Sequence, residues 1–93
     1  MTIQSFRCKD TQALFGRRRV KRFIAIEAVA RRKLELLDAA TQLDFLRVPP
    51  GNRLEALSGK RKGQYSIRVN DQFRVCFVWT AEGPDQVEIV DYH

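Results

Sequence analysis

The most regular pattern in the chain lies between Gly59 and Trp79, where the sequence is GKRKGQYSIRVNDQFRVCFVW. Two runs of alternating apolar and polar residues, rich in β-branched and aromatic side chains, flank the polar segment Asn70-Asp71-Gln72. This pattern predicts a β-hairpin. A three-residue connection at 70–72 keeps the apolar side chains on one face, whereas a two-residue turn would mix the faces, because a slip of one residue exchanges them.

That register gives the hairpin two chemically different faces. The apolar face is predicted to contain Tyr65, Ile67, Val69, Phe73, Val75, Phe77 and Trp79, and the other face Ser66, Arg68, Arg74 and Cys76. Arg68 then lies opposite Arg74, and like charges in this position repel by about 0.2–1 kcal/mol. Either an anion such as a phosphate lies between the two guanidinium groups, or both side chains extend into solvent. The pattern favours neither alternative.

Length and charge limit the classes of protein that fit. A chain of 93 residues provides one small core, so a single domain over residues 1–93 is expected. The 17 Lys and Arg residues against 11 Asp and Glu give a net charge of +6, which points to an anionic partner, with nucleic acid first. No apolar run has the length of a secretion signal core or a membrane span, so we expect a cytoplasmic protein with no membrane partner.

The residue counts also argue against a metal or a cofactor. Cys8 and Cys76 are expected to be buried free thiols. One His and two Cys are too few for the usual zinc ligand set. The basic loop Gly59 to Gly63 lacks the spacing of a nucleotide-binding phosphate loop. The sequence therefore predicts no metal site and no cofactor.

Outside the hairpin, periodicity and capping residues predict the remaining elements. We expect a first strand over Ile3 to Cys8, a short helix over Gln12 to Phe15 capped by Asp10 or Thr11 and ended by Gly16, a long helix from Phe23 to Ala40 or Thr41, a short strand or helical turn over Leu43 to Arg47, and a last strand over Gln86 to Val90. In the long helix, the buried face is predicted to contain Phe23, Ile26, Ala30, Leu34 and Leu37, and residues 31–33 are predicted to face mostly outward.

A dense cationic run precedes the long helix. Its charged residues are Arg17, Arg18, Arg19, Lys21 and Arg22. The run is either a solvated surface, a contact for a nucleic acid backbone, or a contact for an acidic segment of a partner protein. The spacing does not decide between these alternatives.

The carboxyl end combines three side chains suited to acid–base chemistry on RNA. Asp91, Tyr92 and His93 supply a carboxylate, a phenol that can stack on a base, and the one imidazole of the chain. Together with nearby arginines they would support metal-free cleavage of RNA by its own 2′-OH. A terminal His is, however, more often only an exposed chain end. Strict alternation also puts Asp91 on the same face as Ile89, which looks buried, so either the strand runs past the helices or a bulge turns it.

Three segments resemble the HigB toxins, which belong to the RelE/ParE superfamily of type II toxin–antitoxin systems. They are Pro49 to Leu57 (PPGNRLEAL), Gly63 to Phe77 (GQYSIRVNDQFRVCF) and Val87 to His93 (VEIVDYH). The resemblance implies an α+β fold, with helices packed on one face of a small twisted, mostly antiparallel sheet. It also implies an endoribonuclease that cuts mRNA in the A site of the 70S ribosome. The implied partner is a HigA-like helix-turn-helix antitoxin, through which alone the toxin would reach operator DNA.

The resemblance also suggests roles for individual residues. Asp91, Tyr92 and His93 match the functional tail of the family, Arg68 and Arg74 match positions that hold substrate phosphate, and Lys60, Arg61 and Lys62 match the basic loop that faces RNA. Some relatives carry His in place of Glu55 and Lys in place of Ser58, so we expect weaker cleavage by this chain. The alternative function is a protein-binding inhibitor of DNA gyrase, as in ParE relatives.

Overall fold

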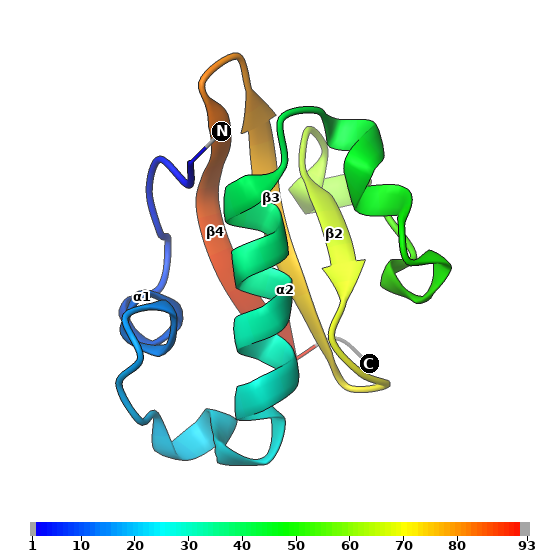
Figure 1. Ribbon diagram of the computed structural model, residues 1–93. Helices are drawn as coiled ribbons and strands as arrows, with labels where there is room; N and C mark the ends of the chain where they lie inside the picture. The colour runs from blue at the N-terminus through cyan, green and yellow to red at the C-terminus, as the bar shows by residue number, and fades with distance from the viewer. Residues whose placement is uncertain (1, 92–93) are drawn as a thin grey trace.

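The computed structural model describes residues 2–91, which form an α+β fold. Its elements are α1 (Lys9–Phe15), the 3₁₀ turn η1 (Lys21–Ile26), α2 (Glu27–Ala39), the 3₁₀ turns η2 (Leu43–Arg47) and η3 (Pro50–Asn52), β1 (Glu55–Ala56), the 3₁₀ turn η4 (Gly59–Arg61), β2 (Tyr65–Arg68), β3 (Phe73–Thr80) and β4 (Gly83–Asp91). The sheet is antiparallel with the order β1-β2-β3-β4. Figure 1 shows α2 lying across one face of the sheet and α1 beside β4, so the predicted architecture is confirmed.

The β2–β3 hairpin has the predicted register. Ile67 pairs with Val75 and Arg68 with Arg74, and the amide of Val69 donates to the Phe73 carbonyl (2.9 Å). The turn is held by the side chain of Asn70, whose Oδ1 accepts from the amides of Gln72 (2.9 Å) and Phe73 (2.7 Å). Asn is suited to this position because its short amide can replace a backbone acceptor in a tight turn. The local sequence therefore favours a three-residue turn, and this turn length keeps apolar and polar side chains on opposite faces of the hairpin.

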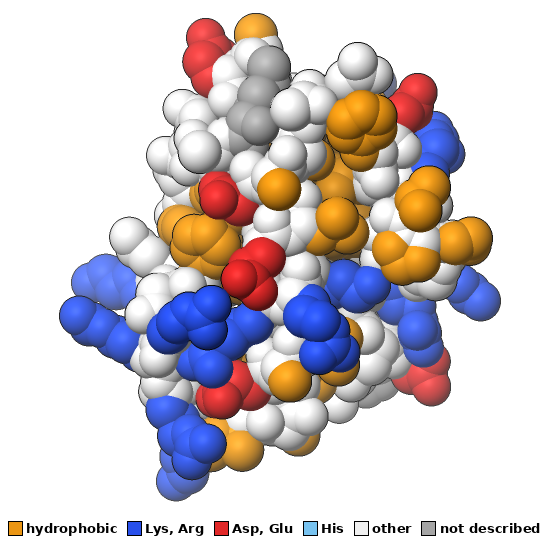
Figure 2. All heavy atoms as spheres, in the orientation of Figure 1, with side chains coloured by type: hydrophobic (Ala, Val, Ile, Leu, Met, Phe, Trp, Pro, Cys, Tyr) orange, Lys and Arg blue, Asp and Glu red, His pale blue; other side chains and the backbone are white. Residues whose placement is uncertain are grey.

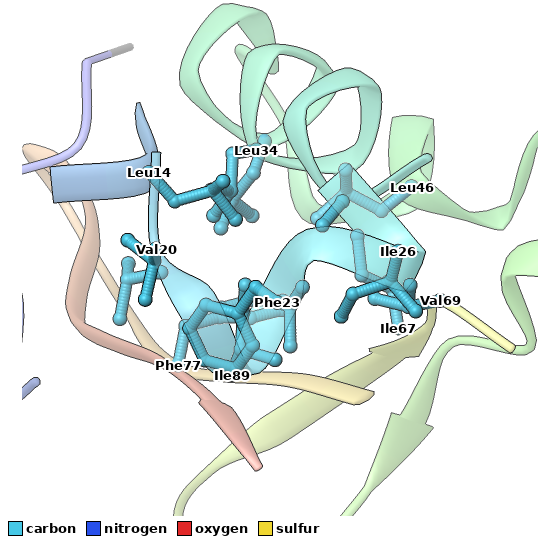
Figure 3. Packing of buried hydrophobic residues seen from close by; sticks show 14 of the residues in the cluster. Leu14, Val20, Phe23, Ile26, Leu34, Leu46, Ile67, Val69, Phe77 and Ile89 are labelled. Atoms are coloured by element: carbon cyan, nitrogen blue, oxygen red, sulfur yellow. The ribbon is translucent and has the colours of Figure 1, made fainter. Parts of the chain in front are cut away.

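The core forms between the apolar face of the sheet and the helices (Figure 3). Its fully buried apolar side chains include Leu14, Phe23, Ala30, Leu34, Leu37, Leu46, Ile67, Val75, Phe77 and Val87. All five side chains predicted to form the buried face of the long helix are buried. Phe23 meets Phe73 edge to face at 6.0 Å, which fixes η1 against the turn end of the hairpin.

The predicted long helix is wrong at its start, because its first turns are 3₁₀ and the α-helix begins at Glu27. The amide of Phe23 donates to the carbonyl of Val20 (2.9 Å). In a 3₁₀ helix, residues three apart lie on the same side. The tighter winding therefore turns both Phe23 and Ile26 into the core, where both are buried.

The capping prediction for α1 is also wrong. The helix begins at Lys9, with Cys8 before it, and neither Asp10 nor Thr11 caps it. The hydroxyl of Thr11 instead accepts from the amide of Ile89 (3.0 Å). The helix ends at Phe15 with Gly16 as its C-cap, as predicted, and the left-handed residue that follows is Arg17 (φ 65°).

The two ends of the chain differ from the predicted strands. Residues 3–8 form no regular strand, and their one β-bridge to β4 is the parallel bridge between Phe6 and Val87. The last strand begins at Gly83, earlier than expected. Gln86 has φ 52°, and the pairing with β3 shifts by one residue next to it, so β4 contains a bulge there. The bulge interrupts the alternation of buried and exposed side chains along β4, so the sequence pattern predicts a strand only from residue 86 onward.

The fold predicts a strong dependence of stability on Leu34, which is fully buried between the helices and the sheet. The Leu34→Ala variant should lower the free energy of unfolding by about 2–5 kcal/mol, because it removes buried methyl groups and leaves a cavity. Urea denaturation measures this change. The neighbouring Glu35→Ala variant should cost under about 1 kcal/mol, since its ion pair with Arg17 is exposed. Equal effects of the two variants would contradict the described packing.

Candidate functional site

Strand pairing brings the two predicted arginines next to the end of β4. Arg74 in β3 pairs with Arg68 on one side and with Val90 on the other. The next residue of β4, Asp91, pairs with Phe73. Because Ile67 and Val75 face the core, Arg68 and Arg74 lie on the face of the sheet away from α2.

Arg74 is held by the protein on every side of its guanidinium group. Its Nε donates to Ser66 Oγ (2.8 Å), its Nη2 donates to the Arg53 carbonyl (2.7 Å), and its Nη1 lies 3.7 Å from Glu55 Oε1. Only 11% of the side chain is exposed. The prediction that Arg74 either binds an anion or extends into solvent is therefore incomplete, because protein acceptors satisfy the charge.

Arg68 is the more accessible member of the pair. Its guanidinium group pairs with the carboxylate of Asp71, and 33% of its side chain is exposed. Asp71 itself is fully exposed, so this ion pair is open to water and to competing anions. The two arginines thus differ: Arg74 is built into the sheet, while Arg68 has a partner that a phosphate can replace.

The basic loop, residues 59–63, lies on the same face, and Arg61 attaches it to the sheet. Arg61 donates to Glu88 Oε1 (3.1 Å) and to Gln64 Oε1 (3.1 Å). Arg7 also pairs with Glu88, at 3.5 Å. Arg61 is therefore turned toward the sheet, whereas Lys60 and Lys62 are exposed and form no ion pair among residues 2–91.

Asp91 is the one member of the predicted acid–base tail that can be placed. It is exposed although it has the same parity as buried Ile89, so the end of β4 runs past the packed layer. The bulge at Gln86 lies too early in the strand to turn it. The side-chain Nε2 of Gln72 donates to Asp91 Oδ2 (3.0 Å), which links the carboxylate to the hairpin turn. Tyr92 and His93 lie outside the described residues.

The cationic run at 17–22 lies on the helical side of the molecule. Figure 2 shows Lys and Arg side chains gathered over the half of this face that contains α1, η1 and the start of α2. Three of the five charges have carboxylate partners: Arg17 with Glu35, Arg19 with Glu27, and Arg22 with Asp10. Arg18 and Lys21 are exposed. The structure thus separates this run from the arginine pair on the opposite face of the sheet.

Residues 31–33 are predicted to face mostly outward, but Arg31 and Lys33 are only partly exposed. Arg31 crosses from α2 to donate to the carbonyls of Leu14 (3.1 Å) and Arg18 (3.0 Å). It also pairs with Glu27 at 3.0 Å. These contacts fix the loop between α1 and η1, so Arg31 serves to hold the cationic run in place. Of the three residues, Arg32 is exposed as expected.

The two cysteines are free, as expected, but only Cys76 is buried as predicted, and Cys8 is partly exposed. Burial raises the pKa of Cys8, yet hydrogen bonds from Thr11 and Asp10 and the charge of Arg22 outweigh it, so the pKa lies below its ordinary value. The Nη2 group of Arg22 lies 3.3 Å from the sulfur. Burial raises the pKa of Cys76 above its ordinary value, and the charge of Arg61 only partly offsets this.

Some residues of this region were not found from the sequence. Glu55, Ser66 and Glu88 supply the oxygen atoms that hold Arg74 and Arg61. Alternation indicated that Ser66 shares the polar face with the arginines, which was a usable signal. No local signal pairs Glu88 with Arg61, because the two residues are far apart in the chain. Within residues 2–91, no group of three or more His, Cys, Asp or Glu side chains is placed to hold a metal ion.

Comparison with known proteins identifies the class. The family model for the RelE-like toxin of the type II toxin–antitoxin system HigB matches residues 4–93. Toxin HigB-1 of Vibrio cholerae serotype O1 is 56% identical over 55 residues, which are 59% of this chain and 58% of that protein. An uncharacterized protein of Haemophilus influenzae is 45% identical over 49 residues, which are 53% of this chain and 48% of that protein.

The aligned segments span about half the length of these two relatives. The match of the family model, in contrast, covers nearly the whole chain. The α+β fold, with its helices on one face of an antiparallel sheet, agrees with this class. The chain belongs to the HigB-like family of RelE-like toxins of type II toxin–antitoxin systems. Among residues 2–91, none of the helices has the length and apolar character that a membrane span requires.

The contacts predict unequal structural roles for the two arginines. The Arg74→Gln variant should lower the free energy of unfolding by about 1–3 kcal/mol, because it removes the charged donor of the buried Ser66 hydroxyl and of the Arg53 carbonyl. The Arg68→Gln variant should cost under about 1 kcal/mol, since its ion pair is exposed. Urea denaturation of both variants tests this order. A larger loss for Arg68→Gln would show that the assigned contacts are wrong.

The thiols predict selective alkylation. At neutral pH a lower pKa means more thiolate, so iodoacetamide should modify Cys8 and leave buried Cys76 intact in the folded protein. The Arg22→Gln variant removes a neighbouring positive charge, which raises the pKa of Cys8, and alkylation should slow by roughly twofold or more. Mass spectrometry over time measures the rate. Arg47→Gln, which changes a distant exposed ion pair, serves as the control. Equal rates in both variants would contradict the role of Arg22.

Proposed function

We propose that this toxin is a ribosome-dependent endoribonuclease that cleaves mRNA without a cofactor. The single observation that carries the proposal is the strand register, which sets Arg68 and Arg74 beside the end of β4, where Asp91 begins the Asp-Tyr-His tail. Membership of the HigB-like family supports the same activity. We infer that Asp91, Tyr92 and His93 form the reacting end of the site.

The proposed reaction uses the 2′-OH of the substrate as its nucleophile. A base takes the proton of the 2′-OH, the 2′-oxygen attacks the adjacent phosphorus, and the bond to the 5′-oxygen breaks as an acid protonates that oxygen. His93 and Asp91 are the candidates for these two proton transfers. A nearby guanidinium group would stabilise the charge that develops on the phosphoryl oxygens. DNA lacks the 2′-OH and should resist this reaction.

The contacts of the two arginines support different roles in this reaction. Arg74 has its donors engaged by Ser66 and the Arg53 carbonyl, so we assign it to shaping the sheet face. Arg68 exchanges an exposed carboxylate for a phosphate more readily, so we assign it to the substrate. The Glu55 carboxylate lies 3.7 Å from Arg74 and partly offsets its positive charge, which makes the potential at the site less positive. This supports the expectation of slower cleavage than in relatives with His at that position.

The ribosome and an antitoxin are the proposed partners. Asp91 is exposed at the end of β4, so the ribosome would have to position the mRNA. The exposed Lys60 and Lys62 are suited to nonspecific contacts with RNA backbone, as is the 17–22 run. A HigA-like helix-turn-helix antitoxin would neutralise the toxin and connect it to operator DNA. No feature of residues 2–91 favours the gyrase alternative, so we do not propose it.

Two variants test the proposal in a translating extract. Asp91→Asn and His93→Ala should each reduce mRNA cleavage by about a hundredfold or more, because each removes a proton-transfer group. Mapping of mRNA ends measures the cleavage, and the melting temperature shows whether each variant is folded. Asp44→Asn, which neutralises an exposed carboxylate remote from the site, should cleave like the wild type. Full cleavage by folded His93→Ala, or equally fast cleavage of naked RNA, would overturn the proposal.

A further inference from the structure

The backbone between η2 and β1 is held from the inside by the side chain of Asn52. This residue is fully buried, and its Nδ2 donates to the carbonyls of Leu46 (3.1 Å) and Val48 (3.3 Å). Its Oδ1 accepts from Nζ of Lys33 in α2, and its backbone amide donates to the Pro49 carbonyl (2.9 Å). Because donors and acceptors of the amide group are all engaged, Asn52 has one fixed orientation and fixes the backbone at its own position.

The residue that follows Asn52 has an uncommon backbone conformation. Arg53 is left-handed, with φ 46° and ψ 59°, and its amide donates to the Pro50 carbonyl (3.1 Å). Residues other than glycine adopt this conformation rarely, and they keep it where the surrounding contacts fix it. Arg53 is itself exposed, so we attribute its conformation to the turn and to the buried Asn52 rather than to packing of its own side chain.

The left-handed conformation directs the Arg53 carbonyl to the polar face of the sheet. There it accepts from Nη2 of Arg74 (2.7 Å). Asn52 contacts α2 on one face of the sheet, whereas Arg74 lies on the other face, so the chain at 52–53 passes around the β2 side of the sheet. Figure 1 shows the green segment 43–53 at this side. A continuous series of contacts therefore connects α2 to the guanidinium group of Arg74.

We propose that Asn52 is a positioning residue for RNA cleavage, which acts by setting the Arg53 carbonyl that holds the Arg74 guanidinium group beside the end of β4. The inference rests on the proposed function and adds to it a buried residue that acts only through Arg53 and Arg74. Arg74 pairs with Val90 in the sheet, next to Asp91. A positive charge fixed at this place stabilises negative charge that develops on the phosphate without first having to reorient.

The side-chain Nε–H of Arg74 reports on its position. It donates to Ser66 Oγ (2.8 Å), and the side chain is 11% exposed, so this proton should exchange slowly with water. In folded Asn52→Ala, exchange should be about tenfold faster, because the Arg53 carbonyl no longer holds the guanidinium group. Heteronuclear NMR spectra measure the rate. Leu14→Ala creates a cavity in a remote part of the core and should leave the rate unchanged while the protein is folded.

Two substitutions of Arg53 test the same connection without changing Asn52, which matters if Asn52→Ala does not fold. Both remove the same exposed side chain, but glycine adopts the left-handed conformation readily and β-branched valine does not. Arg53→Gly should keep the slow exchange of Arg74. Arg53→Val should exchange faster and should cleave mRNA about tenfold more slowly than Arg53→Gly. Equal exchange and equal cleavage by the two folded variants would overturn the proposal.

A double-mutant cycle separates positioning from a general loss of stability. Asn52→Ala should slow mRNA cleavage in the translating extract by about tenfold or more when Arg74 is present. In the Arg74→Lys background it should have almost no further effect, because both changes act through the same guanidinium group. Equal losses in the two backgrounds would assign Asn52 to the fold alone and overturn the proposal, as would unchanged cleavage by Asn52→Ala.

The NMR measurement keeps this inference distinct from the proposed function. If the wild type cleaves mRNA but folded Asn52→Ala keeps the slow exchange of Arg74, the positioning role is wrong and the activity stands. If the wild type does not cleave but Asn52→Ala and Arg53→Val both speed the exchange, the activity is wrong, and the control of Arg74 by Asn52 stands.

Discussion

The register of the β2–β3 pairing is the constraint on which the other features of the molecule depend. It is set locally, by an Asn70 side chain that accepts two backbone amides and so closes a three-residue turn. A slip of one residue would move Ile67 and Val75 out of the core and carry guanidinium groups into it. The cost of burying such charges without partners far exceeds the cost of the repulsion between Arg68 and Arg74. The core thus enforces an arrangement of charges that the sheet alone would disfavour.

On the polar face, the two facing arginines have different numbers of acceptors. Arg74 has little access to water, so its charge requires protein partners. It donates to the Ser66 hydroxyl and the Arg53 carbonyl and forms an ion pair with Glu55. The carboxylate of Glu88 accepts a hydrogen bond from Arg61 and forms an ion pair with Arg7, so it connects the basic loop and the first segment to β4. These contacts make the second face of the sheet a network of charges that supports the fold.

Features set by local sequence could be predicted, and features set by distant contacts could not. The hairpin, its turn and the buried face of the helical segment follow from alternation and spacing within short windows. The left-handed conformation of Arg17 instead depends on how the loop after α1 is held, and Arg31 reaches that loop from α2. The position of the Lys33 ammonium group likewise depends on Asn52, in another segment of the chain. Alternation placed both arginines on the polar face, but it could not tell which of them would find acceptors.

The two arginines of the hairpin differ because the protein provides Arg74 with more acceptors than Arg68. A guanidinium group whose donors are already engaged, such as that of Arg74, gains little from a phosphate and loses native contacts if it turns to bind one. Arg68 has the opposite balance, because it pairs with Asp71, a carboxylate that is fully exposed to water. Another anion can replace that partner at a small cost, since ion pairs open to solvent contribute little to stability. The two arginines share one face of the sheet, yet they differ in burial and in their acceptors.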